Sequence, residues 1–183
     1  MKIPRWPALI LANYRTGSSP LCQGLALENS VTAFVEPSIT QERVDEFMKH
    51  YSSTSQYIVK FMPDQVDSFT PYQELLNSDC FKIKLTRKDK ASQIASYYIA
   101  SVRDKWWTTK TEESKNYFVP IIHDKILHCI THIKQVDLML ESFENFDIEL
   151  YYEDIGIIED IDRVHSRKPA NFEHLINIIK EQL

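Results

Sequence analysis

Short apolar runs of strand length alternate along this sequence with longer stretches in which apolar residues recur at helical spacing. The runs span residues 8–12, 31–35, 57–62, 81–86 and 146–152. The helical stretches lie over about 20–27, 38–51, 71–77, 91–102, 117–144 and 172–183. This alternation predicts parallel strands whose connecting helices cover the sheet. We therefore expect an α/β fold, a three-layer sandwich around a central, mostly parallel sheet of about five strands.

Length and composition limit what such a fold can do. With 183 residues, of which 43% are hydrophobic, the chain is long enough for one domain over 1–183 with a sizeable core and a C-terminal helix within about 170–183. A net charge of −5 argues against broad electrostatic binding to nucleic acid. Apolar stretches stay far short of the ~20 residues of a membrane span, and we expect neither a span nor a secretory signal.

Three cysteines are odd in number and far apart in the chain, namely Cys22, Cys80 and Cys129. This pattern is typical of reduced, partly buried thiols, so we expect a cytoplasmic protein. The sequence shows no metal-ligand spacing, and no metal site is expected.

The turn after the first apolar run has the composition of an anion-binding loop. Residues 13–19 read N-Y-R-T-G-S-S, and a helical pattern begins at about Pro20. Backbone N–H groups at a helix start attract an anion, and Gly17 lets the backbone approach it closely. Arg15 adds a forked cation, and hydroxyl donors come from Thr16, Ser18 and Ser19. The loop lacks the lysine of a Walker A motif, and an ordinary strand-to-helix turn remains the alternative.

A second cationic turn follows the fourth apolar run. Arg87 and Lys88 come directly after that run, and Asp89 is placed to cap the next helix. Ser96 lies about two turns into this helix, so a strand-end cation and a helix hydroxyl can grip a phosphate from two sides. A solvated charge run at a helix start is the alternative. The carboxyl ends of parallel strands share one edge of a sheet, which places both turns there, together with Glu36 after the second run.

In sequence order these motifs resemble the sulfotransferases that use 3′-phosphoadenosine 5′-phosphosulfate (PAPS), most closely the bacterial carbohydrate branch that includes the trehalose type. Residues 15–22, R-T-G-S-S-P-L-C, are similar to the loop of that branch that binds the 5′-phosphosulfate. Residues 85–100, L-T-R-K-D-K-A-S-Q-I-A-S-Y-Y-I-A, are similar to its 3′-phosphate segment, which a Trp follows, here Trp106 or Trp107. Residues 152–155, Y-E-D-I, are similar to its segment after the last strand.

The resemblance implies a P-loop-NTPase-like sulfotransferase fold and an enzyme that moves a sulfuryl group from PAPS to a hydroxyl of a carbohydrate or small metabolite. PAPS would be the co-substrate and PAP the product, and a homodimer is compatible with this class. The nucleotide ligands would come from both turns, namely Arg15, Thr16, Gly17, Ser18, Ser19, Arg87 or Lys88, and Ser96. The candidates for the family's basic loop that closes over the nucleotide are Arg163, His165, Arg167 and Lys168.

Sulfuryl transfer also needs a group that stabilises the leaving phosphate and a base that takes the proton of the acceptor hydroxyl. Arg15 suits the first role. In the family branch the base is a Glu after the second strand, and Glu36 stands in the register that the resemblance implies. The alternative for Glu36 is a solvated loop carboxylate, and the rival bases lie in helical patterns, namely His50, His123 and His128.

Two other classes of function remain open at this stage. A kinase-like phosphotransferase would share a nucleotide site, but the Walker lysine and an obvious Mg²⁺ carboxylate are missing from the sequence. A catalytically inactive protein that binds PAP or PAPS would keep the fold without turning over a substrate.

Overall fold

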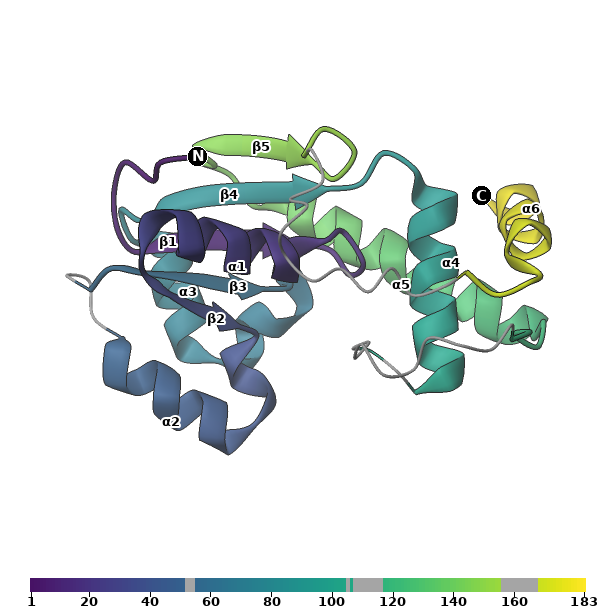
Figure 1. The fold of residues 1–183 in the computed structure, drawn as a ribbon, viewed down its shortest axis with the longest axis horizontal. Helices are drawn as coiled ribbons and strands as arrows, with labels where there is room; N and C mark the ends of the chain where they lie inside the picture. Colours follow the sequence, from purple (N-terminus) through teal and green to yellow (C-terminus); the bar gives the residue numbers. More distant parts are fainter. Residues whose placement is uncertain (52–54, 105, 107–116, 156–167) are drawn as a thin grey trace. The chain divides into compact units, whose positions relative to one another are not determined.

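Strands and helices alternate along the chain, as the apolar runs predict (Figure 1). The computed structural model describes residues 1–51, 55–104, 106, 117–155 and 168–183. The strands are β1 (Ala8–Ala12), β2 (Thr32–Val35), β3 (Tyr57–Phe61), β4 (Phe81–Thr86) and β5 (Ile148–Tyr151). The helices are α1 (Ser18–Asn29), α2 (Gln41–His50), α3 (Thr70–Asn77), α4 (Lys90–Arg103), α5 (His123–Ser142) and α6 (Phe172–Gln182), with short 3₁₀ turns η1 (Pro37–Ile39) and η2 (Pro63–Ser68).

The strands form one parallel sheet in the order β2-β3-β1-β4-β5. β1 lies in the centre between β3 and β4, and all of its residues are buried. Its register pairs Leu11 with Phe61 on one side and with Lys84 on the other. A strand buried on both faces reads as a continuous apolar run, which explains the clear signal of A-L-I-L-A. The prediction of an α/β fold around a parallel sheet of about five strands is confirmed.

Helices cover both faces of this sheet. On one face, α1 shares a core cluster with alternate residues of β1, through Leu21, Cys22, Leu25 and Ala26. On the other face, the cluster joins the remaining β1 residues to α2, α3 and the end of α5, through Phe47, Tyr72, Leu75 and Leu140. Successive side chains of a strand point to opposite faces, so a single strand contributes to both clusters. The arrangement is therefore helix, sheet and helix.

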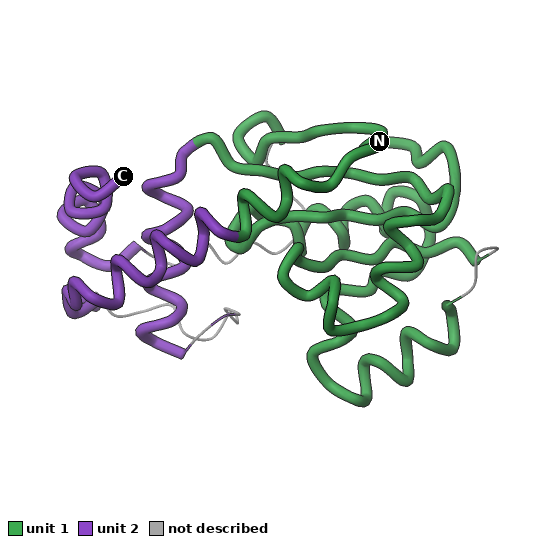
Figure 2. The backbone as a smooth tube through the Cα atoms, turned by 180° about the vertical axis from the view of Figure 1, so that it is seen from behind, with its two compact units in different colours: residues 1–88, 136–158 green, residues 89–135, 159–183 purple. Residues whose placement is uncertain are grey.

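The chain divides into two compact units (Figure 2). Residues 1–88 and 136–158 form the sheet unit, and residues 89–135 and 159–183 form the helical unit. In the helical unit α4 packs against α6, with Ile94 and Tyr98 buried on α4 and Leu175 and Ile179 buried on α6. The hydroxyl of Tyr98 donates to Pro120 O at 2.5 Å and accepts from Ile122 N at 3.0 Å.

Two element boundaries differ from those expected. The helix expected over 117–144 begins at His123, because the Asn171 side chain takes both backbone groups of Val119. Val119 N donates to Asn171 Oδ1 at 3.1 Å, and Asn171 Nδ2 donates to Val119 O at 2.8 Å. The strand expected over 146–152 is shorter and spans Ile148–Tyr151; just before it, the Asp147 carboxylate accepts a hydrogen bond from Lys82 N at 2.8 Å. The sequence also predicts a polar loop over 108–116 and a charged linker over 162–169; this loop and most of this linker lie outside the described residues.

All three cysteines are free and buried. Burial raises the pKa of Cys22 to about 12, so its thiol stays protonated and unreactive near neutral pH. In the part of the chain that the structure describes, no helix combines the length and the apolar character needed to cross a membrane.

Candidate functional site

The carboxyl edge of the sheet carries the polar residues that follow four of its strands. Because β1 to β4 are parallel, Arg15, Glu36, Pro63 and Arg87 leave the sheet at the same edge. All four belong to the sheet unit. In parallel sheets, ligands bind outside this edge, where connections from neighbouring strands turn in opposite directions.

Hydrogen bonds within the first loop fix its shape. The Asn13 side chain accepts from Tyr14 N at 2.6 Å and donates to Asp137 Oδ1 at 2.8 Å. The hydroxyl of Thr16 donates to Asn13 O at 2.8 Å, and the Thr16 residue is fully buried. The predicted ligand Thr16 thus uses its hydroxyl proton inside the loop, which leaves Ser18 and Ser19 as the hydroxyls at the helix start.

Gly17 is the N-cap of α1 and stands in the left-handed backbone region, at φ 74°. A Cβ added there would lie 2.7 Å from Cδ2 of Tyr152, so both the backbone angle and the space favour glycine. The first turn of α1 carries no acidic side chain and has no side-chain cap. Its backbone N–H groups and the positive end of the helix dipole therefore remain suited to an anion.

Two arginines from different strand ends lie side by side at this loop. Arg87 Nη1 donates to the carbonyl oxygen of Arg15 at 3.3 Å, and the Arg87 guanidinium lies 4.7 Å from the ring centroid of Tyr152. Burial lowers the pKa of Arg15, and the positive charge of Arg87 lowers it further. The Glu153 carboxylate lies near Arg87, with Oε1 3.8 Å from Arg87 Nε. Two cations held together in a partly buried loop favour a multiply charged anion between or beside them.

Lys88 points its side chain to other partners. Its Nζ pairs with Asp154 at 2.8 Å and lies 4.6 Å from the ring centroid of Tyr151, while its backbone N–H donates to Glu153 at 3.0 Å. The hydrogen bond to Asp154 raises the pKa of Lys88. Of the two candidate phosphate ligands in the second turn, Arg87 is thus the one placed at the first loop.

Glu36 lies in a buried ion pair that the sequence did not suggest. Lys60 Nζ of β3 is 2.5 Å from Glu36 Oε1, and the two side chains are 2% and 8% exposed. Gln65 Nε2 donates to the other carboxylate oxygen of Glu36 at 3.3 Å, and Glu36 N donates to Lys60 O at 2.7 Å. Burial lowers the pKa of Lys60, although Glu36 opposes this shift.

Lys60 is a residue of the candidate site that sequence reasoning missed. It stands within the apolar run Y-I-V-K-F of β3, where a strand position gives no hint of a nearby carboxylate. The available signal was the single charge inside a run whose other side chains are apolar or aromatic, since a buried lysine needs a partner. The same reasoning missed Tyr14, whose hydroxyl donates to Asp64 at 2.9 Å and ties the first loop to η2.

No model of a known protein family matches the chain, and no curated protein matches it either. The function is therefore inferred from the residues and geometry of the carboxyl edge.

The remaining predicted site residues lie elsewhere in the chain. Ser96 stands on α4 and Lys168 precedes α6, and both belong to the helical unit. Lys168 is exposed, with its Nζ 4.4 Å from the ring centroid of Phe172. Among the other candidates, Trp107, Arg163, His165 and Arg167 lie outside the described residues.

The three rival bases are exposed on helices. His50, in the last turn of α2, places Nδ1 3.1 Å from Glu46 O and its ring 5.3 Å from that of Phe34. His123 begins α5, and His128 stacks on His132 at 6.4 Å in the helical unit. Trp106 is 37% exposed and meets Tyr97 edge-on at 5.3 Å.

Proposed function

We propose that this chain is a PAPS-dependent sulfotransferase that acts on a hydroxyl of a carbohydrate or small metabolite. The observation that carries the proposal is the pairing of Arg15 with Arg87 at the start of α1, where Arg87 Nη1 lies 3.3 Å from Arg15 O. PAPS has anionic groups at two positions of its ribose, so one donor can engage cations from two strand ends. The finer fold assignment, a P-loop-NTPase-like sulfotransferase fold, is part of the same proposal.

The donor is held by the two turns. The phosphosulfate is bound by Arg15, Ser18, Ser19 and the N–H groups of the first turn of α1, because the helix N-terminus and the guanidinium both attract negative charge. Arg87 binds the 3′-phosphate; Ser96, which the resemblance assigns to the same phosphate, and Lys168, a candidate for the loop that closes over the nucleotide, belong to the helical unit. Lys88 is left out of this set, because Asp154 already neutralises it at 2.8 Å.

Transfer of the sulfuryl group forms a bond between sulfur and the acceptor oxygen while the bond from sulfur to the bridging phosphate oxygen breaks. Negative charge grows on that bridging oxygen and leaves with PAP. Arg15 stabilises this charge in a loop whose backbone is already fixed, which is how preorganised donors lower a barrier. Positioning and electrostatics dominate the related transfer of phosphoryl groups.

The acceptor proton goes to Glu36. Lys60 holds Oε1 of this carboxylate at 2.5 Å, so the buried side chain is held in a fixed orientation. Gln65 holds the other oxygen at 3.3 Å, a long contact that an incoming hydroxyl can replace. Carboxylates are among the side chains that act as general bases.

The test is turnover of PAPS carrying labelled sulfate with a panel of sugars and small alcohols, read by transfer of the label. Label transfer without added metal supports the proposal. Stabilisation by PAP in a thermal shift assay without turnover would leave an inactive binding protein. Stabilisation by ATP that depends on magnesium, with no response to PAP, would indicate a phosphotransferase and overturn the proposal.

A further inference from the structure

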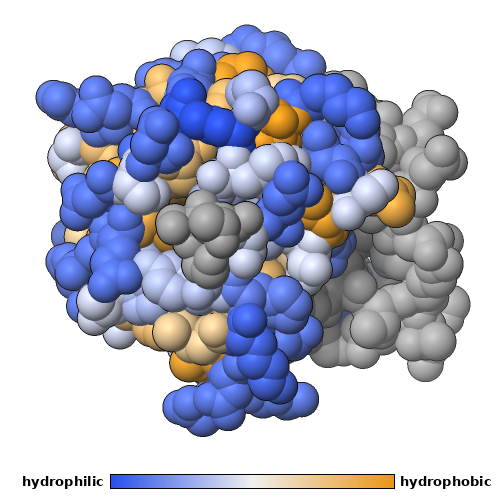
Figure 3. All heavy atoms as spheres, turned by 90° about the vertical axis from the view of Figure 1, so that its left-hand side faces the viewer, coloured by the Kyte–Doolittle hydropathy of each residue, from blue (hydrophilic) through white to orange (hydrophobic). Residues whose placement is uncertain are grey.

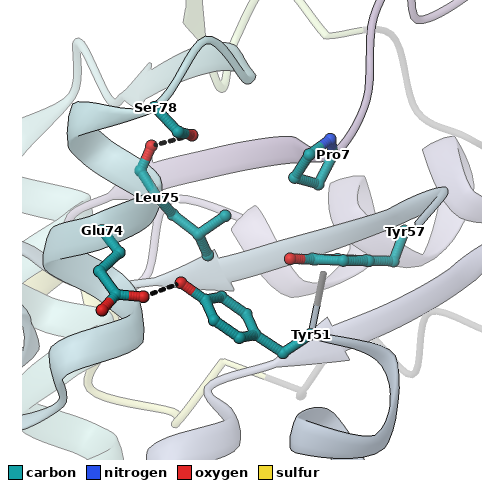
Figure 4. A pocket seen from close by; sticks show the side chains of 6 residues that line it. All are labelled: Pro7, Tyr51, Tyr57, Glu74, Leu75 and Ser78. Atoms are coloured by element: carbon teal, nitrogen blue, oxygen red, sulfur yellow. Dashed lines mark hydrogen bonds between the residues drawn. The ribbon is translucent and has the colours of Figure 1, made fainter. Parts of the chain in front are cut away.

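A pocket lies at the amino-terminal edge of the sheet, opposite the edge that carries the candidate site. It has a volume of about 260 Å³ and is lined by Pro7, Tyr51, Tyr57, Glu74, Leu75 and Ser78 (Figure 4). Pro7 precedes β1 and Tyr57 begins β3, so this pocket, called here the Tyr57 pocket, stands at the end of the strands away from Arg15 and Glu36. All six residues belong to the sheet unit. The volume suits a molecule of a few heavy atoms.

The hydroxyl of Tyr57 is the feature that needs explaining. The residue is 1% exposed, and its oxygen has no hydrogen-bond partner among the described residues. Edge contacts with Phe34 and Phe47, each at 5.8 Å between ring centroids, fix the ring. Its hydroxyl therefore points into the space bounded by Tyr51 and Leu75 and cannot turn to solvent (Figure 4). Buried polar groups without a partner are rare in native proteins and call for a ligand or an ordered water.

The other hydroxyl groups of the Tyr57 pocket already donate their protons in hydrogen bonds within the protein. The Tyr51 hydroxyl donates to the Glu74 carboxylate, and the Ser78 hydroxyl donates to Leu75 O at 2.9 Å. What these groups still offer is lone pairs and one negative charge, which suit a cationic donor. Burial raises the pKa of Tyr57, so its phenol keeps a proton and can donate to an acceptor oxygen.

We propose that the Tyr57 pocket binds a small aliphatic amino alcohol. The ammonium group of such a ligand pairs with Glu74 and the lone pairs beside it, and its hydroxyl oxygen accepts from Tyr57. Leu75 and Pro7 contact the carbon chain. The surrounding face of the sheet unit is largely hydrophilic, with apolar residues visible only in small patches, which favours a polar small molecule over an apolar docking partner (Figure 3).

Three probes of equal size separate the contributions. Aminopropanol carries both groups, butylamine lacks the hydroxyl, and propanediol lacks the charge. In amide NMR titrations of the whole chain, aminopropanol should move the signals of Leu75 and Ser78 with a Kd on the order of 1 mM. Butylamine should bind about threefold to tenfold more weakly, and propanediol more than tenfold more weakly, because the lost contact with Glu74 involves a charge.

Two variants assign the contacts. In Tyr57→Phe, which keeps the ring, aminopropanol and butylamine should bind equally, and in Glu74→Gln the preference for the amine over propanediol should disappear. Glu42→Gln changes an exposed carboxylate in the first turn of α2 and should alter nothing. Shifts that persist unchanged in Tyr57→Phe would overturn the proposal. So would the absence of shifts at Leu75 and Ser78 at about fiftyfold the expected Kd, which would mean that water alone fills the space.

Discussion

Two residues of the carboxyl edge hold backbone angles that side chains rarely adopt. Arg15 has φ 59° and Glu36 has φ 50°, and each directly or closely follows a strand. Ser30 and Asp104 also have positive φ, but they are helix C-caps, where this conformation is common. A non-glycine residue in this region costs about 1–3 kcal/mol, and such strain gathers at functional sites. The strain supports the assignment of Arg15 and Glu36 to one site.

Replacing Arg15 by alanine tests its role in the transition state. If the guanidinium stabilises the leaving oxygen, Arg15→Ala should lower kcat by about 10²–10³-fold beyond any change in donor affinity. Arg15→Lys keeps the positive charge but loses the forked guanidinium, and its kcat should lie between those of the wild type and Arg15→Ala. Steady-state kinetics with PAPS varied decide the matter. A variant with normal kcat and only a raised donor KM would reduce Arg15 to a binding residue.

Glu36→Gln tests the base. The amide keeps the size of the side chain but cannot accept the acceptor proton, so kcat should fall about 10²-fold or more while PAP binding stays near normal. Glu42→Gln, on an exposed part of α2, is the matched control and should keep full activity. Normal turnover in Glu36→Gln with loss of activity in His50→Ala, His123→Ala or His128→Ala would move the base to a histidine.

The same substitution has a pH-dependent effect on stability through Lys60. Without Glu36, the buried ammonium loses the partner 2.5 Å away, and breaking a buried pair costs about 3–5 kcal/mol near neutral pH. The pKa of Lys60 is already lowered by burial and should fall further in Glu36→Gln. A lysine with a lowered folded pKa binds fewer protons folded than unfolded, so stability rises with pH between the folded and unfolded pKa values.

The pH range between the folded and the unfolded pKa of Lys60 extends to lower pH in Glu36→Gln than in the wild type. The difference in stability between the two proteins should therefore shrink as pH rises from 7 toward the unfolded lysine pKa of about 10.4. Urea unfolding at several pH values measures the gap. The double variant Glu36→Gln/Lys60→Met removes both charges and should recover most of the loss at neutral pH. A gap that stays constant with pH would show that Lys60 does not titrate in this range.

At the scale of elements, the junction between β1 and α1 joins the sheet to the anion site. Gly17 caps α1 with φ 74° and stands against the ring of Tyr152, which follows β5. The segment after β5 thus packs on the loop after β1, although the two are far apart in the sequence. It also supplies the contacts of Arg87 and Lys88, at Glu153 and Asp154.

Gly17→Ala should therefore destabilise the fold, by about 1–3 kcal/mol, because the added Cβ would stand 2.7 Å from Tyr152 on a backbone that disfavours it. Gly24 offers the matched control, since it lies inside α1, where alanine is favoured by about 0.5–1 kcal/mol. Urea unfolding of both variants should thus give shifts of opposite sign. Equal shifts would show that the Tyr152 contact and the positive φ do not constrain position 17.

The strands were predictable from sequence and their side-chain partners were not. A buried parallel strand such as β1 leaves a continuous apolar run, and its end marks the carboxyl edge within a residue or two. Lys60 gives no such sign of its partner, because the pairing of β3 with β2 brings it to Glu36 from 24 positions away. The unpartnered hydroxyl of Tyr57 is likewise a property of packing, since β3 shows it only as an aromatic strand residue.

At the scale of the whole molecule, the predicted nucleotide ligands are divided between the two units. Arg15, Ser18 and Arg87 belong to the sheet unit, whereas Ser96 and Lys168 belong to the helical unit. The resemblance assigns Arg87 and Ser96 to the same 3′-phosphate. The part that each unit plays in nucleotide binding can therefore be tested by substitutions in that unit alone.

Comparison of PAP with AMP isolates the 3′-phosphate, which AMP lacks. Arg87→Ala should weaken PAP by about 10- to 100-fold, the range for a lost charged hydrogen bond, and AMP by less than about threefold. Ser96→Ala should weaken PAP selectively by about tenfold if the helical unit shares the phosphate. Lys88→Ala is the control and should spare both ligands, since Asp154 holds Lys88 at 2.8 Å. Calorimetric titration gives the Kd values. Equal losses of PAP and AMP in Arg87→Ala would remove the 3′-phosphate from this arginine, and an unchanged PAP affinity in Ser96→Ala would confine the nucleotide phosphates to the sheet unit.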